Sequence, residues 1–442
     1  METKPAQPRI ALVLIHGIGE QRPMETLRDF IKAVFPADWT CRSRPDRLAA
    51  SLEVRKIQVE APDSGPRVDC HEYYWAHHIQ GTSVVHILRW LVRLFRTPDR
   101  DLEAMSSHLS NNTYTWAKGA AAATAFLLAA VTAAGMYWVN SGGWASKAWA
   151  WIALSPIPLA LSGLWLLLQT KFVEVVGDAA RYLDNAPANI AARQVIRREC
   201  MEILEALNQS YSRVIIVGHS LGSVIAYDAL KFLWAGQKPH AGMPATESNT
   251  IGLRLLHNPP RVGLPRFLAI QHRLFNELIA GNSDQPWRIS DLITLGSPLA
   301  HAPMLFSRSR DEFDELKLQR EFPTSPPQND GGSGICGWYE DGTLFLHHAA
   351  LFAVVRWTNI CFPGDPIAGP LRDVFGSGIK DVHLTGGKGN YADHVRYWQS
   401  DRPGYAPIAG EIMALVRSEA DQAARVQTSA TCTRILPCDL DR

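Results

Sequence analysis

The stretch RVIIVGHSLGSVIAYDAL, residues 213 to 230, constrains the fold more than any other part of the chain. Apolar, β-favouring residues lead into GHSLG at 218 to 222, and a helical pattern follows directly. A serine at so sharp a turn from strand to helix must adopt a strained backbone conformation, and side chains two residues either side would collide with their surroundings, which explains Gly218 and Gly222. Ser220 is therefore either a turn residue or an exposed nucleophile at the amino terminus of a helix.

A second glycine turn, near the start of the chain, indicates the fold class. Residues 10 to 15, IALVLI, predict a fully apolar strand that stops at HGIGEQRP, and the helical pattern METLRDFIKAVF follows. Residues 52–60 and 67–75 predict two further strands separated by a Pro-Asp-Ser-Gly-Pro turn. Strands alternating with helices predict an α/β fold with a mostly parallel sheet flanked by helices.

The middle and later parts of the chain predict further elements. Residues 189–210 and a segment within 266–280 predict helices, and residues 287–300 predict a strand that ends in a glycine turn. Residues 236–260 are rich in Pro, Gly and Asn and predict a surface excursion. The stretch LFLHHAALFAVV, residues 344 to 355, predicts a helix that leads into a strand.

Charge and cysteine content limit the partners and the compartment. Lysine and arginine number 44 against 43 acidic residues, so no excess of positive charge indicates a nucleic-acid partner. The seven cysteines are scattered without the spacing of metal ligands, which predicts reduced thiols in a cytosolic compartment. The opening residues METKPAQPRI lack the apolar core of a secretory signal.

Two uncharged runs predict a transmembrane hairpin within residues 116–170. Residues 119–139 and 148–169 contain no charged side chain, and at about 1.5 Å per residue each would span roughly 30 Å, the thickness of a hydrocarbon core. Both carry Trp or Tyr near an end, as interface belts do. The alternative is a pair of buried helices in a soluble domain.

Residues 84–100 predict an amphipathic helix at the membrane surface. His86, Arg89, Arg93 and Arg96 would form one stripe on a strongly apolar helix, a pattern that suits either a bilayer surface or the protein core. Positive residues flank the hairpin, whereas its loop holds a single lysine. The positive-inside rule therefore predicts two spans in a bacterial inner membrane, with both long flanks on the cytoplasmic side.

The chain resembles α/β-hydrolases of the lipase/esterase type. The resemblance rests on GHSLG and on LVLIHGIG at 12 to 19, and extends to LITLGSPL, NICFPGDP and the late His394. More loosely, it is similar to membrane-bound lipases of the GPI-inositol-deacylase kind, which also join this fold to membrane helices. It implies an α/β-hydrolase fold built from residues 1–83 and 171–417, interrupted by the membrane segments and followed by a polar tail at 418–442.

The resemblance also implies a catalytic triad in the order serine, acid, histidine. Ser220 would be the nucleophile. The favoured acid is Asp365, in the loop just past a predicted strand, where this fold places its carboxylate. Four other aspartates compete for this role: Asp291, Asp341, Asp373 and Asp381.

Two histidines follow Asp365. His394 precedes a helix-like segment and is the favoured base, whereas the pattern around His383 is that of a strand or turn. In the expected mechanism Ser220 attacks an ester carbonyl, His394 transfers the proton and Asp365 holds the imidazole tautomer.

An oxyanion hole is implied by the same family. Its donors would be the backbone amides of Leu221 and Ile18. Gly17 and Gly19 would let the backbone approach the substrate, and His16 would support this loop, with His219 completing the serine motif. Such a triad needs no metal or cofactor, and no metal-spaced cluster is visible in the sequence.

These expectations combine into a membrane-anchored serine hydrolase that cleaves carboxylic esters of lipids through an acyl-enzyme. A site close to the bilayer would take a membrane lipid directly from it. One alternative is hydrolysis of acyl-proteins or acyl-thioesters by the same triad. The other is a non-catalytic interaction protein that keeps the fold. The sequence specifies no protein partner.

Overall fold

A computed structural model describes the protein. The chain forms two compact units, residues 79–190 and the remainder. The segment 84–100, the hairpin predicted within 116–170 and the tail 418–442 lie outside the described residues. Those residues are 9–17, 22–46, 48, 55–62, 66–78, 182, 187–236, 242–257, 262–281, 287–330, 334–363, 365, 367–385, 391–395, 397–398 and 407–417.

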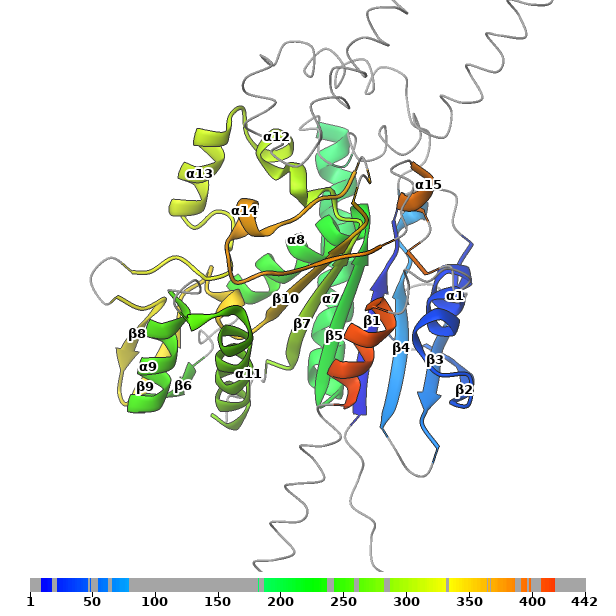
Figure 1. Cartoon of the computed structure of the whole chain (residues 1–442), viewed down its shortest axis with the longest axis horizontal. Helices are drawn as coiled ribbons and strands as arrows, with labels where there is room; N and C mark the ends of the chain where they lie inside the picture. The colour runs from blue at the N-terminus through cyan, green and yellow to red at the C-terminus, as the bar shows by residue number, and fades with distance from the viewer. Residues whose placement is uncertain are drawn as a thin grey trace, which may run out of the picture. The chain divides into compact units, whose positions relative to one another are not determined.

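An eight-stranded sheet forms the centre of the larger unit (Figure 1), in the order β11-β10-β7-β5-β1-β4-β3-β2. All neighbours from β4 to β11 pair in parallel, whereas β3 runs antiparallel to both β4 and β2. The predicted α/β class with a mostly parallel sheet is confirmed. The strands are β1 (Arg9–Ile15), β2 (Thr40–Pro45), β3 (Arg55–Glu60), β4 (Arg67–Tyr73), β5 (Arg213–His219), β7 (Ile289–Leu295), β10 (Arg356–Cys361) and β11 (Lys380–His383).

Helices cover both faces of this sheet. Strands β1 and β5 are apolar on both sides because alternate side chains point to opposite faces and each face is buried. One face packs against α1 (Glu25–Val34) and the helical residues 407–417 in a single apolar core. Helix α8 (Leu221–Ala235) contacts β5, β1 and β7 but takes no part in that core, so it lies on the opposite face.

The remaining elements surround this sheet. The prediction of a helix over 189–210 is confirmed by α7 (Pro187–Ser210), and that within 266–280 by α11 (Leu264–Ala280). A small second sheet consists of β6 (Gly242–Pro244), β9 (Thr343–Leu346) and β8 (Gly337–Glu340). The others are α9 (Glu247–Leu256), α12 (Ala302–Phe306), α13 (Arg310–Leu318), α14 (Arg372–Phe375), α15 (Tyr391–His394) and the 3₁₀ turns η1 (Ala76–His78), η2 (Pro298–His301) and η3 (Leu351–Ala353).

Two local predictions are wrong. Residues 344–355 were expected to be helical, but they form β9 and the turn η3. Their side chains are largely buried in both elements, and an apolar run that is buried all round has no periodicity to separate a helix from a strand. Residues 236–260 do not form a plain surface excursion, since they contain β6 and α9.

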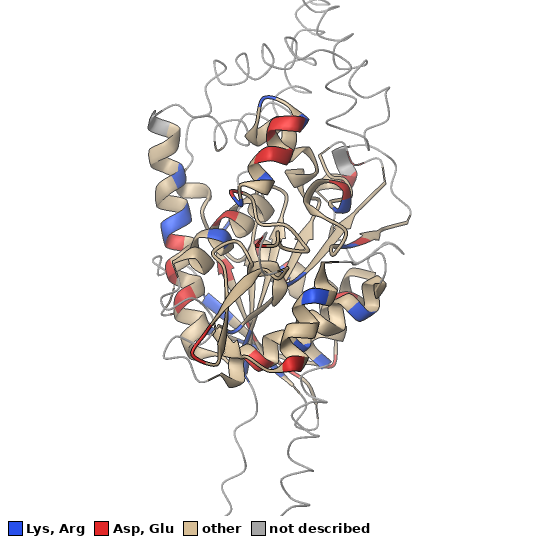
Figure 2. Cartoon of the chain, turned by 90° about the vertical axis from the view of Figure 1, so that its left-hand side faces the viewer, with Lys and Arg blue, Asp and Glu red and all other residues tan. Residues whose placement is uncertain are grey.

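The helices carry mixed charge. Figure 2 shows basic and acidic residues interspersed along the helices on the side that it presents, while the strands are mostly uncharged. Within the part of the chain that the structure describes, no helix combines the length and the apolar character needed to cross a bilayer. The predicted spans at 119–139 and 148–169 are not among these residues.

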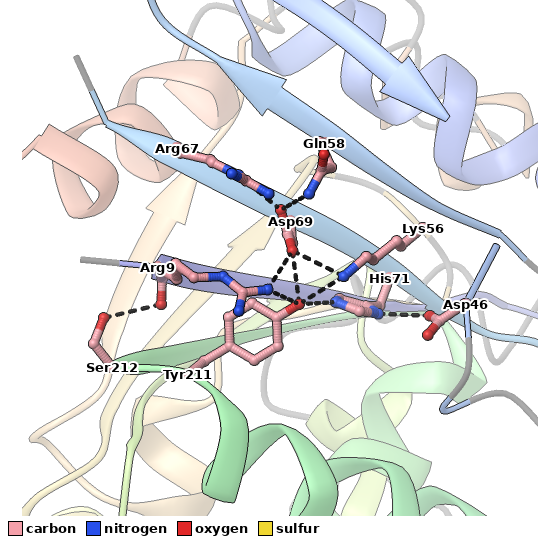
Figure 3. Close-up of polar contacts among 9 residues, drawn as sticks. All are labelled: Arg9, Asp46, Lys56, Gln58, Arg67, Asp69, His71, Tyr211 and Ser212. Carbon is pink, nitrogen blue, oxygen red and sulfur yellow. Dashed lines mark hydrogen bonds and ion pairs between the residues drawn. The ribbon is translucent and has the colours of Figure 1, made fainter. Parts of the chain in front are cut away.

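A polar network lies near the amino-terminal ends of β4, β1 and β5 (Figure 3). The buried carboxylate of Asp69 accepts hydrogen bonds from Tyr211 (2.8 Å), Gln58 (3.0 Å), Lys56 (3.1 Å) and Arg9 (3.1 Å). Burial alone would raise the pKa of Asp69, but the hydrogen bonds from Tyr211, Lys56 and Arg9 outweigh it and hold that pKa far below its ordinary value. The network therefore joins the starts of three strands at the edge away from Ser220.

Candidate active site

Ser220 lies at the sharp turn between β5 and α8. Its backbone has φ 50° and ψ −127°, which is strained for any residue other than glycine. A hydrogen bond from its amide to the carbonyl of Leu295 (2.9 Å) ties the turn to the neighbouring strand β7. The strain that the motif predicts is therefore present at Ser220.

The two motif glycines are required by close packing. A Cβ atom on Gly218 would lie 2.6 Å from the Cα atom of Ser223, in the first turn of α8. A Cβ on Gly222 would overlap the backbone carbonyl of Ile15, at the end of β1. Only glycine lets the turn pass between these two segments, as the sequence predicts.

The fold brings Ser220, His394 and Asp365 together. The Ser220 hydroxyl donates to Nε2 of His394 (2.8 Å), and Nδ1 of His394 donates to Oδ2 of Asp365 (3.0 Å). His394 comes from the short helix α15, 174 residues after Ser220, and Asp365 follows β10. All three side chains are buried. Serine, imidazole and carboxylate are thus hydrogen-bonded in sequence, as nucleophilic catalysis by a serine requires.

The carboxylate of Asp365 has a full set of partners. Oδ2 accepts from Tyr397 (2.9 Å) as well as from His394, and Oδ1 accepts from the backbone amide of Ile367 (2.9 Å) and, at 3.3 Å, from that of Ala368. Burial alone would raise the pKa of Asp365, but the hydrogen bond and charge of His394 and the other donors hold it below its ordinary value. The group is therefore kept ionised beside the imidazole.

The competing aspartates have other partners. Asp291 is buried between Arg213 (2.6 Å) and Arg356 (2.7 Å), so it joins strands β5, β7 and β10. Asp381 accepts from the backbone amides of Leu371 and Arg372. The other two, Asp341 and Asp373, are exposed.

The competing histidine is placed elsewhere. His383 is exposed at the end of β11, where its Nδ1 atom lies 3.7 Å from the Cys361 sulfur. Among the described residues, the imidazole that hydrogen-bonds to Ser220 and to Asp365 is that of His394 and not that of His383. The structure therefore brings the favoured acid and base to the serine and leaves their competitors outside the site.

One of the two expected oxyanion donors is described. Leu221 is the first residue of α8, so its backbone amide is among those that have no partner within the helix. Gly17 lies against the turn, since a Cβ on it would be 2.9 Å from Cβ of Ser220. The other donor, Ile18, and the neighbouring Gly19 fall outside the described residues, and their role stays a prediction.

His16 holds the end of β1 in place. Its Nδ1 donates to the carbonyl of Gly17 (2.8 Å), its Nε2 accepts from the backbone amide of Trp75 (3.3 Å), and the Trp75 indole donates to the His16 carbonyl (2.9 Å). Complete burial lowers the pKa of His16 to about 4, so the ring is neutral at pH 7. These contacts are those of a residue that supports the loop.

Two further side chains hold the triad: sequence reasoning missed Tyr397 and gave His219 only a place in the serine motif. Tyr397 donates to Asp365 and accepts from the backbone amide of Phe362 (3.2 Å). His219 donates from Nε2 to the carbonyl of His394 (2.9 Å). Burial and the nearby His394 lower the pKa of His219 to about 3, so it remains neutral. The sequence signal for Tyr397 is its place three residues after His394, within one turn of that segment.

A second alignment of acid, imidazole and hydroxyl has a different chemistry. His71 Nδ1 lies 2.6 Å from Asp46, and its Nε2 lies 3.1 Å from the hydroxyl of Tyr211 (Figure 3). Burial and the adjacent Asp69 raise the pKa of Tyr211 well above its ordinary value, which disfavours the nucleophilic phenolate. This cluster belongs to the network at the strand starts and fastens them together.

One group of side chains in the described residues has metal-ligating atoms close together. The ligating atoms of His77, His78 and Glu199 all lie within 4.8 Å of one another. The spacing of residues in the sequence does not predict this group, because Glu199 follows His78 by 121 residues.

Comparison with known proteins leaves the site to be interpreted from its own geometry. The chain matches no protein-family model, no curated protein and no solved structure. What the arrangement can do chemically is to deprotonate Ser220 during attack on an electrophilic carbon, with the charge that forms on His394 balanced by Asp365.

Proposed function

We propose that the protein is a serine hydrolase that cleaves carboxylic esters of lipids through an acyl-enzyme. The observation that carries this proposal is the chain of hydrogen bonds from Ser220 to His394 (2.8 Å) and on to Asp365 (3.0 Å). The strained backbone of Ser220 supports it, since residues held in such rare conformations cluster at active sites. We further propose that the sheet belongs to an α/β-hydrolase fold.

The proposed reaction has two halves. As the Ser220 oxygen attacks the ester carbonyl carbon, its proton passes to Nε2 of His394, and the carbonyl oxygen becomes an oxyanion. The backbone amides of Leu221 and Ile18 are the proposed donors to that oxyanion, each contributing about 3 kcal/mol. His394 then protonates the departing alcohol. Water, deprotonated by His394, then attacks the acyl-enzyme, and His394 returns that proton to the Ser220 oxygen as the carboxylic acid is released.

The choice of a lipid ester rests on the sequence. The uncharged runs 119–139 and 148–169 and the basic stripe of 84–100 support anchorage in a bilayer, with the catalytic unit on the cytoplasmic side of a bacterial inner membrane. These segments are inserted in the sequence between β4 and β5, so the proposed anchorage would hold the catalytic unit next to the bilayer. A lipid that is already in the bilayer could then reach Ser220 without passing through water.

An activity-based probe tests the hydrolase itself. We expect a fluorophosphonate to label the full-length chain, and to label neither Ser220→Ala nor His394→Ala. The matched control is His348→Ala, a change at an exposed histidine outside the site. Hydrolysis of a p-nitrophenyl ester by Ser220→Ala at the wild-type rate would refute the assignment of the nucleophile.

A substrate comparison tests the lipid. Rates on a long-chain acylglycerol or phospholipid in liposomes are compared with rates on a soluble short-chain ester, and ester is compared with thioester of the same acyl chain. We expect preference for the ester embedded in the bilayer. A preference for the thioester would favour the acyl-thioester alternative, and a labelled protein that turns over neither would contradict the lipid assignment.

A further inference from the structure

His77, His78 and Glu199 form a compact cluster outside the catalytic triad. The two histidines end the turn η1, and Glu199 lies in α7. Nε2 of His78 is 2.7 Å from Oε2 of Glu199, and the two imidazole rings have centroids only 3.8 Å apart. By contrast, the other adjacent pair, His347 and His348, has centroids 5.9 Å apart, and each ring faces different surroundings.

The donor set suits a transition metal. Two imidazole nitrogens and one carboxylate oxygen are the three-ligand set found in zinc sites that keep a fourth position for water. In a tetrahedral site with metal–ligand distances near 2.1 Å, donor atoms are about 3.4 Å apart. The three donors of this cluster already lie within 4.8 Å of one another, so side-chain rotation alone would bring them to that spacing.

Neighbouring residues contact Glu199 and His77 in the way that residues around a metal site contact its ligands. The Tyr73 hydroxyl donates to the carbonyl of Ile196 (2.8 Å) and lies 3.5 Å from Oε2 of Glu199. The ring of His77 stacks on that of Tyr74 at 5.6 Å and hydrogen-bonds to the Tyr74 backbone. Ligating histidines typically donate their second nitrogen to such a carbonyl. His77 is exposed, which leaves a path for the ion.

We propose that His77, His78 and Glu199 bind one divalent transition-metal ion, Zn²⁺ foremost, that clips together the two points where the chain leaves and re-enters the larger unit. His78 is the last residue of that unit's first segment, and its second segment begins at Ala191, within the same helix as Glu199. The ion would therefore close a loop of 121 residues by linking η1 to α7, and would stabilise the folded chain by mass action.

A competition titration tests the site. The full-length chain, stripped of metal with EDTA, is titrated with Zn²⁺ in the presence of a chromophoric chelator, and bound zinc is counted by elemental analysis. We expect one zinc ion per chain. Each of His77→Ala, His78→Ala and Glu199→Gln should weaken the affinity by at least the roughly 10–100-fold that loss of an outer-shell partner causes. Co²⁺ should give the visible absorption of a four-coordinate site in the wild type and in none of the three cluster variants.

The controls separate the site from folding and from catalysis. His348→Ala should bind zinc as the wild type does, and so should Ser220→Ala, because neither residue belongs to the cluster. Circular dichroism checks that each variant is folded, and Glu199→Gln keeps the size of the side chain. The inference is overturned when the wild type binds no zinc at micromolar free ion, or when all three cluster variants bind it as tightly as the wild type.

Discussion

Replacing Asp365 by asparagine tests how the carboxylate works. Oδ1 of Asp365 accepts from the backbone amides of Ile367 and Ala368, so the asparagine oxygen must occupy that position. The amide nitrogen then takes the place of Oδ2 and faces Nδ1 of His394 and the hydroxyl of Tyr397. An NH₂ group donates there, so Nδ1 of His394 must accept, and its proton moves to Nε2.

That tautomer is the wrong one for the proposed reaction. With a proton on Nε2, His394 cannot take the proton of Ser220, which lies 2.8 Å from it. Loss of the correct tautomer in a serine–histidine–aspartate triad lowers kcat by about 10⁴-fold. At about 1.36 kcal/mol per factor of ten, this is about 5 kcal/mol of transition-state stabilisation.

Steady-state kinetics on a p-nitrophenyl ester provide the assay. We expect kcat to fall by about 10⁴-fold while KM changes little, because Asp365 lies behind His394 and the Ser220–His394 contact is on the far side of the ring. Chemical unfolding should show a loss of about 1–3 kcal/mol, because the asparagine NH₂ cannot accept the buried hydrogen bond that Tyr397 donates to Oδ2. A loss of kcat below tenfold in a folded variant would refute the proposed role of this carboxylate.

Two further changes probe the surroundings of the triad, and a third probes a buried carboxylate in β4. Tyr397→Phe removes one of the donors to Asp365. We expect kcat to fall by tenfold or less and the free energy of unfolding to fall by about 1–2 kcal/mol, since both hydrogen bonds of the hydroxyl are buried. An unchanged kcat together with an unchanged free energy of unfolding would contradict this. Gly222→Ala places a methyl group against the carbonyl of Ile15, and urea unfolding should show a loss of at least about 3 kcal/mol or no folded protein. Burial raises the pKa of Glu72 to about 7, so its contribution to stability is full below the unfolded pKa near 4.3 and is lost as the pH rises through 7. Glu72→Gln should therefore flatten this decline and gain up to about 3 kcal/mol at pH 8; parallel stability–pH profiles would refute it.

The sequence predicted the centre of the fold better than its edges. Strands β1 and β5 were visible because burial on both faces makes them continuous apolar runs. Strand β2, Thr40–Pro45, was missed because every residue in it is exposed, so it carries no hydrophobic pattern. Backbone pairing with β3 places it at the edge of the sheet.

The candidate site was predictable where backbone geometry demands particular residues. Gly218 and Gly222 are required by the turn, and that pattern led to Ser220. Asp365 and His394 followed from the order of residues in a resembling family, and the structure places His394 beside Ser220 and Asp365 beside His394. Tertiary contacts could not be predicted from spacing.

Examples of such contacts are the support that Tyr397 gives to the triad and the approach of Glu199 to the pair at 77–78. Glu199 and His78 are 121 residues apart, so only the folded chain makes them neighbours. A single sequence holds no pattern that marks such a pair.

The network around Asp69 includes Arg9 at the start of β1 and Tyr211 just before β5 (Figure 3), whereas Ser220 of the triad follows the end of β5. The ion pairs of Asp69 with Arg9 and Lys56 and its hydrogen bond from Tyr211 are therefore remote from the loops that would meet a substrate. Substitutions in those loops should therefore alter the substrate preference of the proposed hydrolase without weakening the contacts around Asp69. Directed evolution of specificity should therefore keep Arg9, Lys56 and Tyr211 unchanged and vary residues at the opposite edge of the sheet, around Ser220.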